Sequence, residues 1–146
     1  MSTPSYMSLV SGVVTRLKED NRMDVIADSD IYFGVEPNIP VFPAITVELQ
    51  EAEDVWKTFP NNKDIAARLL VTVMERNMLG YANGLKSIEH YVRIIDDVFH
   101  TDRTISGVCY NSEANTRRFG PGVINDIPVF VCEMELNTIS RYNSRN

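Results

Sequence analysis

The stretch AARLLVTVMERN, residues 66–77, decides which fold we expect of this chain. Its apolar side chains occupy both odd and even positions, namely Leu69, Leu70, Val71, Val73 and Met74. A strand with one solvated face alternates apolar and polar residues, whereas a strand buried on both faces carries a nearly unbroken apolar run. We therefore predict that residues 66–77 form a central β-strand covered on both sides.

The segment that precedes it, VFPAITVELQEAED at residues 41–54, predicts a second strand at about residues 44–50. Ile45, Val47 and Leu49 alternate there with polar side chains, which is the period of a sheet with one buried face. The residues between this strand and the central one are rich in turn-forming types, so we expect a turn region between them.

Two segments show helical spacing. The first covers about residues 4–20, where Thr3 is a candidate N-cap, and its apolar positions are Met7, Val10, Val14 and Leu17. In the second, Asn83 is the candidate N-cap, and an apolar stripe follows at Leu85, Ile88, Val92, Ile95 and Phe99. We predict two amphipathic helices, each packed on the sheet through its apolar stripe.

The remaining segments complete the predicted topology. Two further strands are expected at residues 104–110 and 127–139, separated by a long polar loop at residues 111–124. Residues 21–42 contain closely spaced prolines near their end, which predicts an extended proline-rich connection or arm. Residues 140–146 are expected to fray.

The order of these elements, α-β-β-α-β-β, indicates an α+β fold. We expect a mostly antiparallel four-stranded sheet flanked by two main helices. The length of 146 residues suits a single domain, residues 1–146.

Charge and composition restrict the classes of function. The chain carries 20 acidic and 14 basic residues, a formal net charge of −6. Its only adjacent basic pair is Arg117–Arg118, so we do not expect DNA to be bound as a ligand. The first residues lack the early basic residue and the continuous apolar run of a signal peptide, and no apolar run is long enough for a membrane span. We expect a cytoplasmic protein in which Cys109 and Cys132 are reduced, a disulfide between them being the less favoured alternative.

An acidic cluster, comprising Glu48, Glu51, Glu53 and Asp54, ends the strand at residues 44–50. Carboxylate oxygens could hold a divalent cation, but the glycine-interrupted spacing of a calcium loop is absent and no histidine is near in sequence. We favour a solvated strand end, and a third interpretation is an acidic patch that faces a channel.

Other candidate chemistry is weaker. Asp96 and His100 share one face of the second helix, but a histidine in a last turn is also favoured by the helix dipole. Cys109 lacks a Cys–His signature and is better interpreted as a buried thiol. The sequence FGPGV, residues 119–123, lacks the spacing of a phosphate-binding loop. We therefore predict no catalytic residue, no metal ligand and no cofactor.

The last predicted strand carries a more useful anomaly. Val129 and Val131 share one face with Glu133 and Glu135. A face that is half apolar and half charged suits neither a pure core nor a pure solvent surface, so we interpret it as a candidate subunit interface. A partly covered face of a monomer is the alternative.

The long polar loop predicted at residues 111–124 is a second candidate contact. Arg117, Arg118 and Phe119 lie within it. Two cations beside an aromatic ring on a loop suit the acidic surface of a protein partner, and phosphate binding is the alternative.

The predicted elements include, in order, an N-terminal helix, the strands FPAITVE and ARLLVTVMERN, the amphipathic helix LKSIEHYVRIIDDVF and a terminal strand pair split by a polar loop. Their order resembles that of the tail terminator (tail completion) proteins of tailed bacteriophages. The resemblance covers residues 3–139. It is a similarity of element order and of the FPAITVE strand.

The resemblance implies a structural virion protein without enzymatic activity. Proteins of that family form hexameric rings that cap the tail tube, stop its polymerisation and join it to the neck and head connector. It would place this chain at the tail–neck junction of a virion, and in the host cytoplasm during assembly. Strand and loop edges would form the ring contacts, and acidic side chains would face a lumen through which DNA passes without specific binding.

Two alternatives remain from the sequence. The chain could be another neck component, such as a head-completion adaptor. It could also be a small metal-dependent hydrolase that uses Glu48, Glu51 and Asp54.

Overall fold

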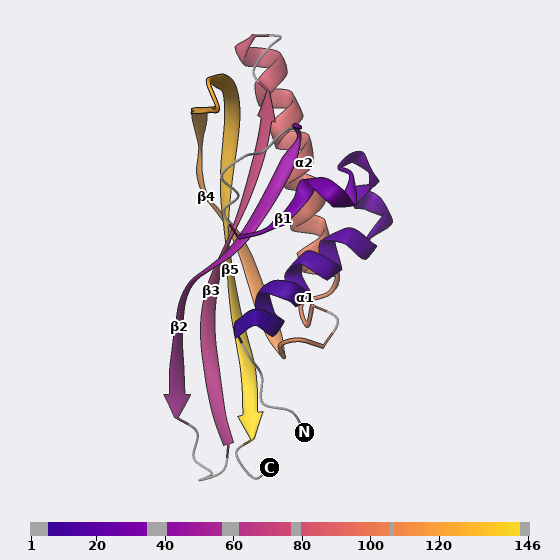
Figure 1. The fold of residues 1–146 in the computed structure, drawn as a ribbon. Helices are drawn as coiled ribbons and strands as arrows, with labels where there is room; N and C mark the ends of the chain where they lie inside the picture. The colour runs from indigo at the N-terminus through magenta and orange to yellow at the C-terminus, as the bar shows by residue number, and fades with distance from the viewer. Residues whose placement is uncertain (1–5, 35–40, 57–61, 77–79, 106, 144–146) are drawn as a thin grey trace.

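The fold is α+β, with two helices on a five-stranded mixed sheet (Figure 1). The computed structural model describes residues 6–34, 41–56, 62–76, 80–105 and 107–143. The elements in chain order are α1 (Tyr6–Glu19), the 3₁₀ helices η1 (Asn21–Val25) and η2 (Asp28–Asp30), β1 (Ile31–Phe33), β2 (Ala44–Trp56), β3 (Asn62–Arg76), α2 (Tyr81–Thr101), β4 (Asn111–Ile124) and β5 (Ile127–Asn143).

The strand order across the sheet is β1-β2-β3-β5-β4. β1 pairs with β2 in parallel, and every other neighbouring pair is antiparallel. The prediction of a four-stranded sheet was therefore wrong by one short strand. The prediction that residues 66–77 form a central strand is confirmed for β3, because β2 and β5 flank it.

Both helices lie on the same face of the sheet (Figure 1). The main core fills the space between them and the sheet, and the stripe of α2 contributes Ile88, Ile95 and Phe99 to it, all buried. Leu85 and Val92 of the same stripe are only half-buried. The predicted packing face of the second helix is thus correct, with its centre displaced toward the C-terminal half.

The helix boundaries differ from the predicted ones. α2 begins at Tyr81 after Gly80, which is the N-cap residue with φ 90°, so Asn83 lies inside the first turn and does not cap the helix. Glycine adopts this positive φ without steric cost. In α1, Met7 is 64% exposed and does not join the core. The predicted cap at Thr3 lies outside the described residues.

The second half of the chain departs most from expectation. In the segment 104–110, predicted as a strand, the described residues 104, 105 and 107–110 form turns and bends, whereas residues 111–124, predicted as a polar loop, form the long strand β4. β4 pairs with β5 through a two-residue turn, Asn125 and Asp126, which have φ of 51° and 65°. Such a turn matches the twist of a hairpin. β4 is polar because it is an edge strand with exposed side chains, and for this reason its composition resembled a loop.

Three further boundaries were wrong. Residues 21–42 are not a plain extended arm, since η1, η2 and β1 occupy most of its first half, and residues 35–40 lie outside the described residues. β2 continues past Gln50 to Trp56. β5 continues to Asn143, so the start of the predicted frayed tail is part of the sheet.

Candidate functional site

The face of the sheet turned away from the helices is the most distinctive surface of the molecule. Along β3, Leu69, Val71 and Val73 point toward the helices and belong to the main core. Side chains alternate along a strand, so the intervening positions point to the opposite side. We call that side the open face. No helix lies on it in the described part of the chain (Figure 1).

One end of the open face is apolar. Ala44 and Met74 are buried there, with Tyr32, Phe42, Ile124 and Val131 packed around them as a second, smaller cluster. This cluster explains why β3 is apolar on both faces although the helices cover only one. The prediction of burial on both sides therefore holds at this end, where the covering comes from neighbouring side chains and not from another helix.

The other part of the open face is charged. Arg68 Nη2 lies 2.9 Å from Glu51 Oε2, and Arg118 Nη1 lies 4.0 Å from Glu133 Oε1. Because the Arg68 and Glu51 side chains are 38% and 58% exposed, their ion pair contributes little to stability. Arg68 Nε is buried without a hydrogen-bond partner among the described residues. These pairs connect neighbouring strands.

The sequence-predicted acidic cluster is divided between two faces. Glu48, Glu51 and Glu53 pair with Leu70, Arg68 and Ala66 of β3, which are open-face positions. Asp54 follows Glu53 directly on a regular stretch of strand, so its side chain is directed to the other face.

The local contacts do not make the acidic cluster a metal site. Glu48 Oε1 accepts a hydrogen bond of 2.8 Å from Gln50, and Glu51 is held by Arg68. Among the described residues, no group of three or more His, Cys, Asp or Glu side chains is placed to hold a metal ion. The geometry thus offers no assembled ligand set for the hydrolase alternative.

The four candidate interface residues of β5 lie together on the open face. Val129 is fully buried, and Val131, Glu133 and Glu135 are half-buried. The mixture of apolar and charged side chains expected from the sequence is therefore present on one surface.

The three residues predicted to form a partner loop lie on a strand and point in different directions. Arg118 is opposite Glu133 on the open face, whereas Phe119 is opposite Cys132 on the helix side. The Phe119 ring lies 6.1 Å from that of Phe130 and is 38% exposed. Arg117 is the extra residue of a β-bulge between Thr116 and Arg118.

Two shallow depressions accompany these surfaces. One, of about 300 Å³, is lined by residues of β2, β3 and β5, including Glu51, Glu53 and Arg68. The other, of about 290 Å³, lies between α2 and the hairpin, where Leu85, Val92 and Phe119 line it. Neither brings together a nucleophile with a base.

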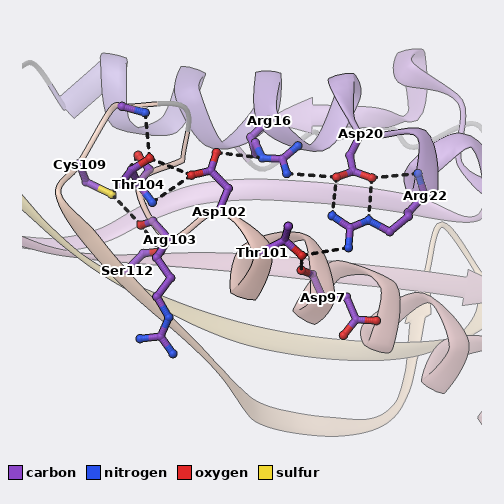
Figure 2. A network of polar contacts seen from close by, with 11 residues as sticks. Arg16, Asp20, Arg22, Asp97, Thr101, Asp102, Arg103, Thr104, Cys109 and Ser112 are labelled. Carbon is purple, nitrogen blue, oxygen red and sulfur yellow. Dashed lines mark hydrogen bonds and ion pairs between the residues drawn. The ribbon is translucent and has the colours of Figure 1, made fainter.

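A polar network that the sequence analysis did not identify joins the ends of the two helices (Figure 2). Asp20 lies 3.1 Å from Arg16 and 2.7 Å from Arg22, and Arg16 also lies 3.4 Å from Asp102. The hydrogen bonds from Arg22, aided by both positive charges, hold the pKa of Asp20 well below its usual range. The Arg16–Asp20 spacing of four on a helix was the available signal. Because Arg16 and Arg22 each face a carboxylate, we interpret the network as a structural contact between the ends of α1 and α2.

The remaining chemical candidates are also structural. His100 Nδ1 lies 2.9 Å from the carbonyl oxygen of Asp96 and 3.3 Å from its carboxylate, a contact within one helical turn at the end of α2. Burial raises the pKa of Cys109 and that of Cys132 to about 11. Both cysteines are free thiols. A thiol with so high a pKa is a poor nucleophile at neutral pH.

Comparison with known proteins adds no identification, since neither a protein-family model nor a curated protein matches this chain. Of the described helices, neither α1 nor α2 combines the length and the apolar composition that a transmembrane helix requires. The functional argument therefore depends on the open face and on the edges of the sheet.

Proposed function

We propose that this chain is a structural virion protein of the tail terminator type, which forms a ring at the top of a phage tail tube and joins the tail to the neck. The single observation that carries the proposal is the open face, a long sheet surface without a covering helix in the described part of the chain (Figure 1), on which half-buried Val131 adjoins half-buried Glu133 and Glu135 beside the buried Val129. A surface of this composition suits contact with another component of an assembly better than contact with bulk water.

The charge of the chain supports the same function. Each subunit carries a net charge of −6, and a ring multiplies it. A lumen of that sign repels DNA phosphates, so DNA would slide through without being held. Glu48, Glu51 and Glu53 on the open face are the carboxylates that would face such a lumen. The partners of this chain would be further copies of the chain, the tail tube and the neck proteins.

Electron microscopy of intact phage particles that contain this chain tests the proposal. A fusion tag on the C-terminus, detected with gold-labelled antibody, is expected at the junction of tail and neck, and an averaged reconstruction is expected to contain a ring of six copies. The label at the head side of the neck would favour the head-completion adaptor instead.

Native mass spectrometry provides the second arm of the test. A six-subunit species without bound metal supports the ring. A monomer that binds a divalent cation stoichiometrically and hydrolyses a substrate would support the metal-dependent hydrolase and overturn the proposal.

A further inference from the structure

Resting on the proposed ring function, we infer that the ring is closed by β-strand pairing between two different edges of the sheet: β4 of one subunit and the distal half of β2 of the next. The inference assigns the occupant of each edge, a second copy of this chain. It begins from the strand order, which leaves two edges of unequal character.

The first edge is β4, the outermost strand on one side. No strand pairs with its outer side over Asn111–Ile124 in the described part of the chain. The second edge belongs to β2. β1 pairs only with Ile45, Thr46 and Val47, so residues 48–56 have no described strand on their outer side. Unpaired edges present free backbone N–H and C=O groups to any strand that fits.

The direction of the strands permits this pairing. β2 is antiparallel to β3, β3 to β5 and β5 to β4, so β4 runs opposite to β2. In a ring whose axis lies roughly along the strands, neighbouring subunits keep the same orientation. β4 of one subunit therefore meets β2 of the next in antiparallel orientation, and all helices stay on one face of the joined sheet.

The charges on the two edges are complementary. The β4 edge carries Arg117 and Arg118 near its middle with one carboxylate, Glu113, toward its start, and the β2 edge carries Glu48, Glu51 and Glu53. The Arg118 side chain is 75% exposed and its contact with Glu133, at 4.0 Å, is long, so it can reach a neighbour.

Complementary edges also discriminate against wrong partners. Pairing β4 with another β4 through the same central segment would bring Arg117 and Arg118 of the two copies together, and pairing β2 with another β2 would bring carboxylates together. Opposite charges directly across a strand pair are favourable and like charges are unfavourable. Head-to-tail pairing is thus selected over a two-fold dimer, and head-to-tail contacts make rings when their rotation closes.

The covered part of β2 sets the register. Residues that lie side by side across the sheet form a row, and one such row contains Arg118, Glu133, Thr72 and Thr46. If neighbouring subunits lay at the same height along the ring axis (the level register), Arg118 of one subunit would therefore lie opposite Thr46 of the next. The outer side of Thr46 is already occupied by β1. A shift of the neighbour by four rows instead places residues 113–120 of β4 against residues 48–55 of β2, beyond the end of β1. Pro121–Ile124 then reach the rows of residues 44–47, where β1 occupies the outer side of β2, so this pairing requires the end of the β4–β5 hairpin to bend away from β1 of the neighbour.

The two β-bulges support this register. Each edge strand has one extra residue, Gln50 in β2 and Arg117 in β4. After the shift of four rows, the two bulges lie next to each other, so the extra residue on one edge offsets the extra residue on the other. An unbroken antiparallel pairing results, with Arg117 opposite Glu51, Arg118 opposite Gln50 and Asn115 opposite Glu53.

The shift also agrees with the geometry of closed sheets. Four residues of strand advance about 14 Å, and the four strands that each subunit contributes to the joined sheet (β2, β3, β5 and β4) span about 19 Å. Repeated at every interface, this stagger corresponds to strands tilted by about 35° from the ring axis. Closed barrels tilt their strands by about 35–45°.

Charge reversal tests the pairing. The basic-edge variant (Arg117→Glu with Arg118→Glu) and the acidic-edge variant (Glu51→Lys with Glu53→Lys) each place like charges across the interface. In sedimentation velocity, each variant alone is expected to need at least a tenfold higher concentration than the wild type for half-assembly. Mixed in equal amounts, the two variants restore opposite charges at every contact, so the mixture is expected to assemble into even-numbered rings.

Matched controls carry the same charge changes on the helices. Lys86→Glu with Arg93→Glu, and Glu19→Lys with Glu89→Lys, alter exposed positions away from both edges. Both controls are expected to assemble as the wild type does, and far-UV circular dichroism checks that all variants fold. Assembly of the edge variants at wild-type concentrations, or a mixture that does not recover, overturns the inference.

Cysteine cross-linking tests the register separately. Asn115→Cys with Glu53→Cys is expected to form disulfides between copies, because the shifted register places these positions opposite each other. Asn115→Cys with Glu48→Cys is the control, since those two positions are opposite only in the level register. Cross-linking of the control pair alone overturns the shifted register.

These outcomes separate the interface from the function. A wild-type ring that the edge variants leave intact overturns the edge pairing and leaves the proposed function standing. A wild-type chain that stays monomeric at millimolar concentration also overturns the edge pairing. Location of the chain outside the tail–neck junction overturns the function, whatever the variants do.

Discussion

Replacement of Ile95 by alanine is expected to destabilise the chain by about 3–4 kcal/mol. Ile95 is fully buried in the main core, at the centre of the α2 stripe. The change removes three carbon atoms, worth about 2.4 kcal/mol at roughly 0.8 kcal/mol for each buried methylene-sized group. The cavity left behind adds to this, and measured Ile→Ala losses in cores are about 2–5 kcal/mol.

Ile94→Ala provides the matched control, because Ile94 is the preceding residue of the same helix and is only half-buried. Both substitutions change helix propensity equally, so the difference between them isolates burial. Urea unfolding followed by circular dichroism, with all proteins at one concentration, measures both losses. The melting temperature of Ile95→Ala should fall by about 6–16 °C. A loss below about 1 kcal/mol, or one equal to the control, would refute the packing described for α2.

Four further predictions follow from the contacts described above. Because the fold lowers the pKa of Asp20, its stabilisation is complete above about pH 4 and is lost as the pH falls; the stability difference between wild type and Asp20→Asn should therefore shrink on acidification, and a difference that stays constant would contradict this. Asn125→Val should cost about 1–2 kcal/mol, since a β-branched residue disfavours the φ of 51°, and an unchanged urea midpoint would count against the turn. With pKa values near 11, Cys109 and Cys132 should react with iodoacetamide at pH 8 at least a hundredfold more slowly in the folded chain than in urea, and fast native labelling would reject their burial. Replacing the carboxylates of the acidic cluster by amides should leave the fold intact, and EDTA should not change the wild-type melting temperature; a drop of several degrees with chelator would indicate a metal after all.

The strand at the centre of the sheet and the two helices were predictable because their signal is local. Burial on both faces requires the unbroken apolar run of β3, and packing on a sheet requires the stripe that contains Ile88 and Ile95. Edge strands lack such a signal. β4 exposes most of its side chains and includes Gly120 and Pro121, so its composition is that of a loop, and only the backbone hydrogen bonds to β5 make it a strand.

The candidate site was predictable in part for the same reason. Alternation along one strand was sufficient to place Val129, Val131, Glu133 and Glu135 on a single face. Which strands lie beside that face, and that Glu51 meets Arg68 there, depends on pairing between residues far apart in sequence. No periodicity within one segment contains that information.

The sequence by itself thus determined the α+β class, the central strand, the core face of α2 and the acid-rich composition, because each follows from short-range periodicity or from totals. Only the tertiary structure decided that both helices share one face, that β1 covers only the start of β2, and that β4 is the opposite edge (Figure 1). These features arise from long-range strand pairing, in which the burial and hydrogen bonding of one segment depend on segments distant in the chain. The open face and the two complementary edges exist only as a result of that pairing.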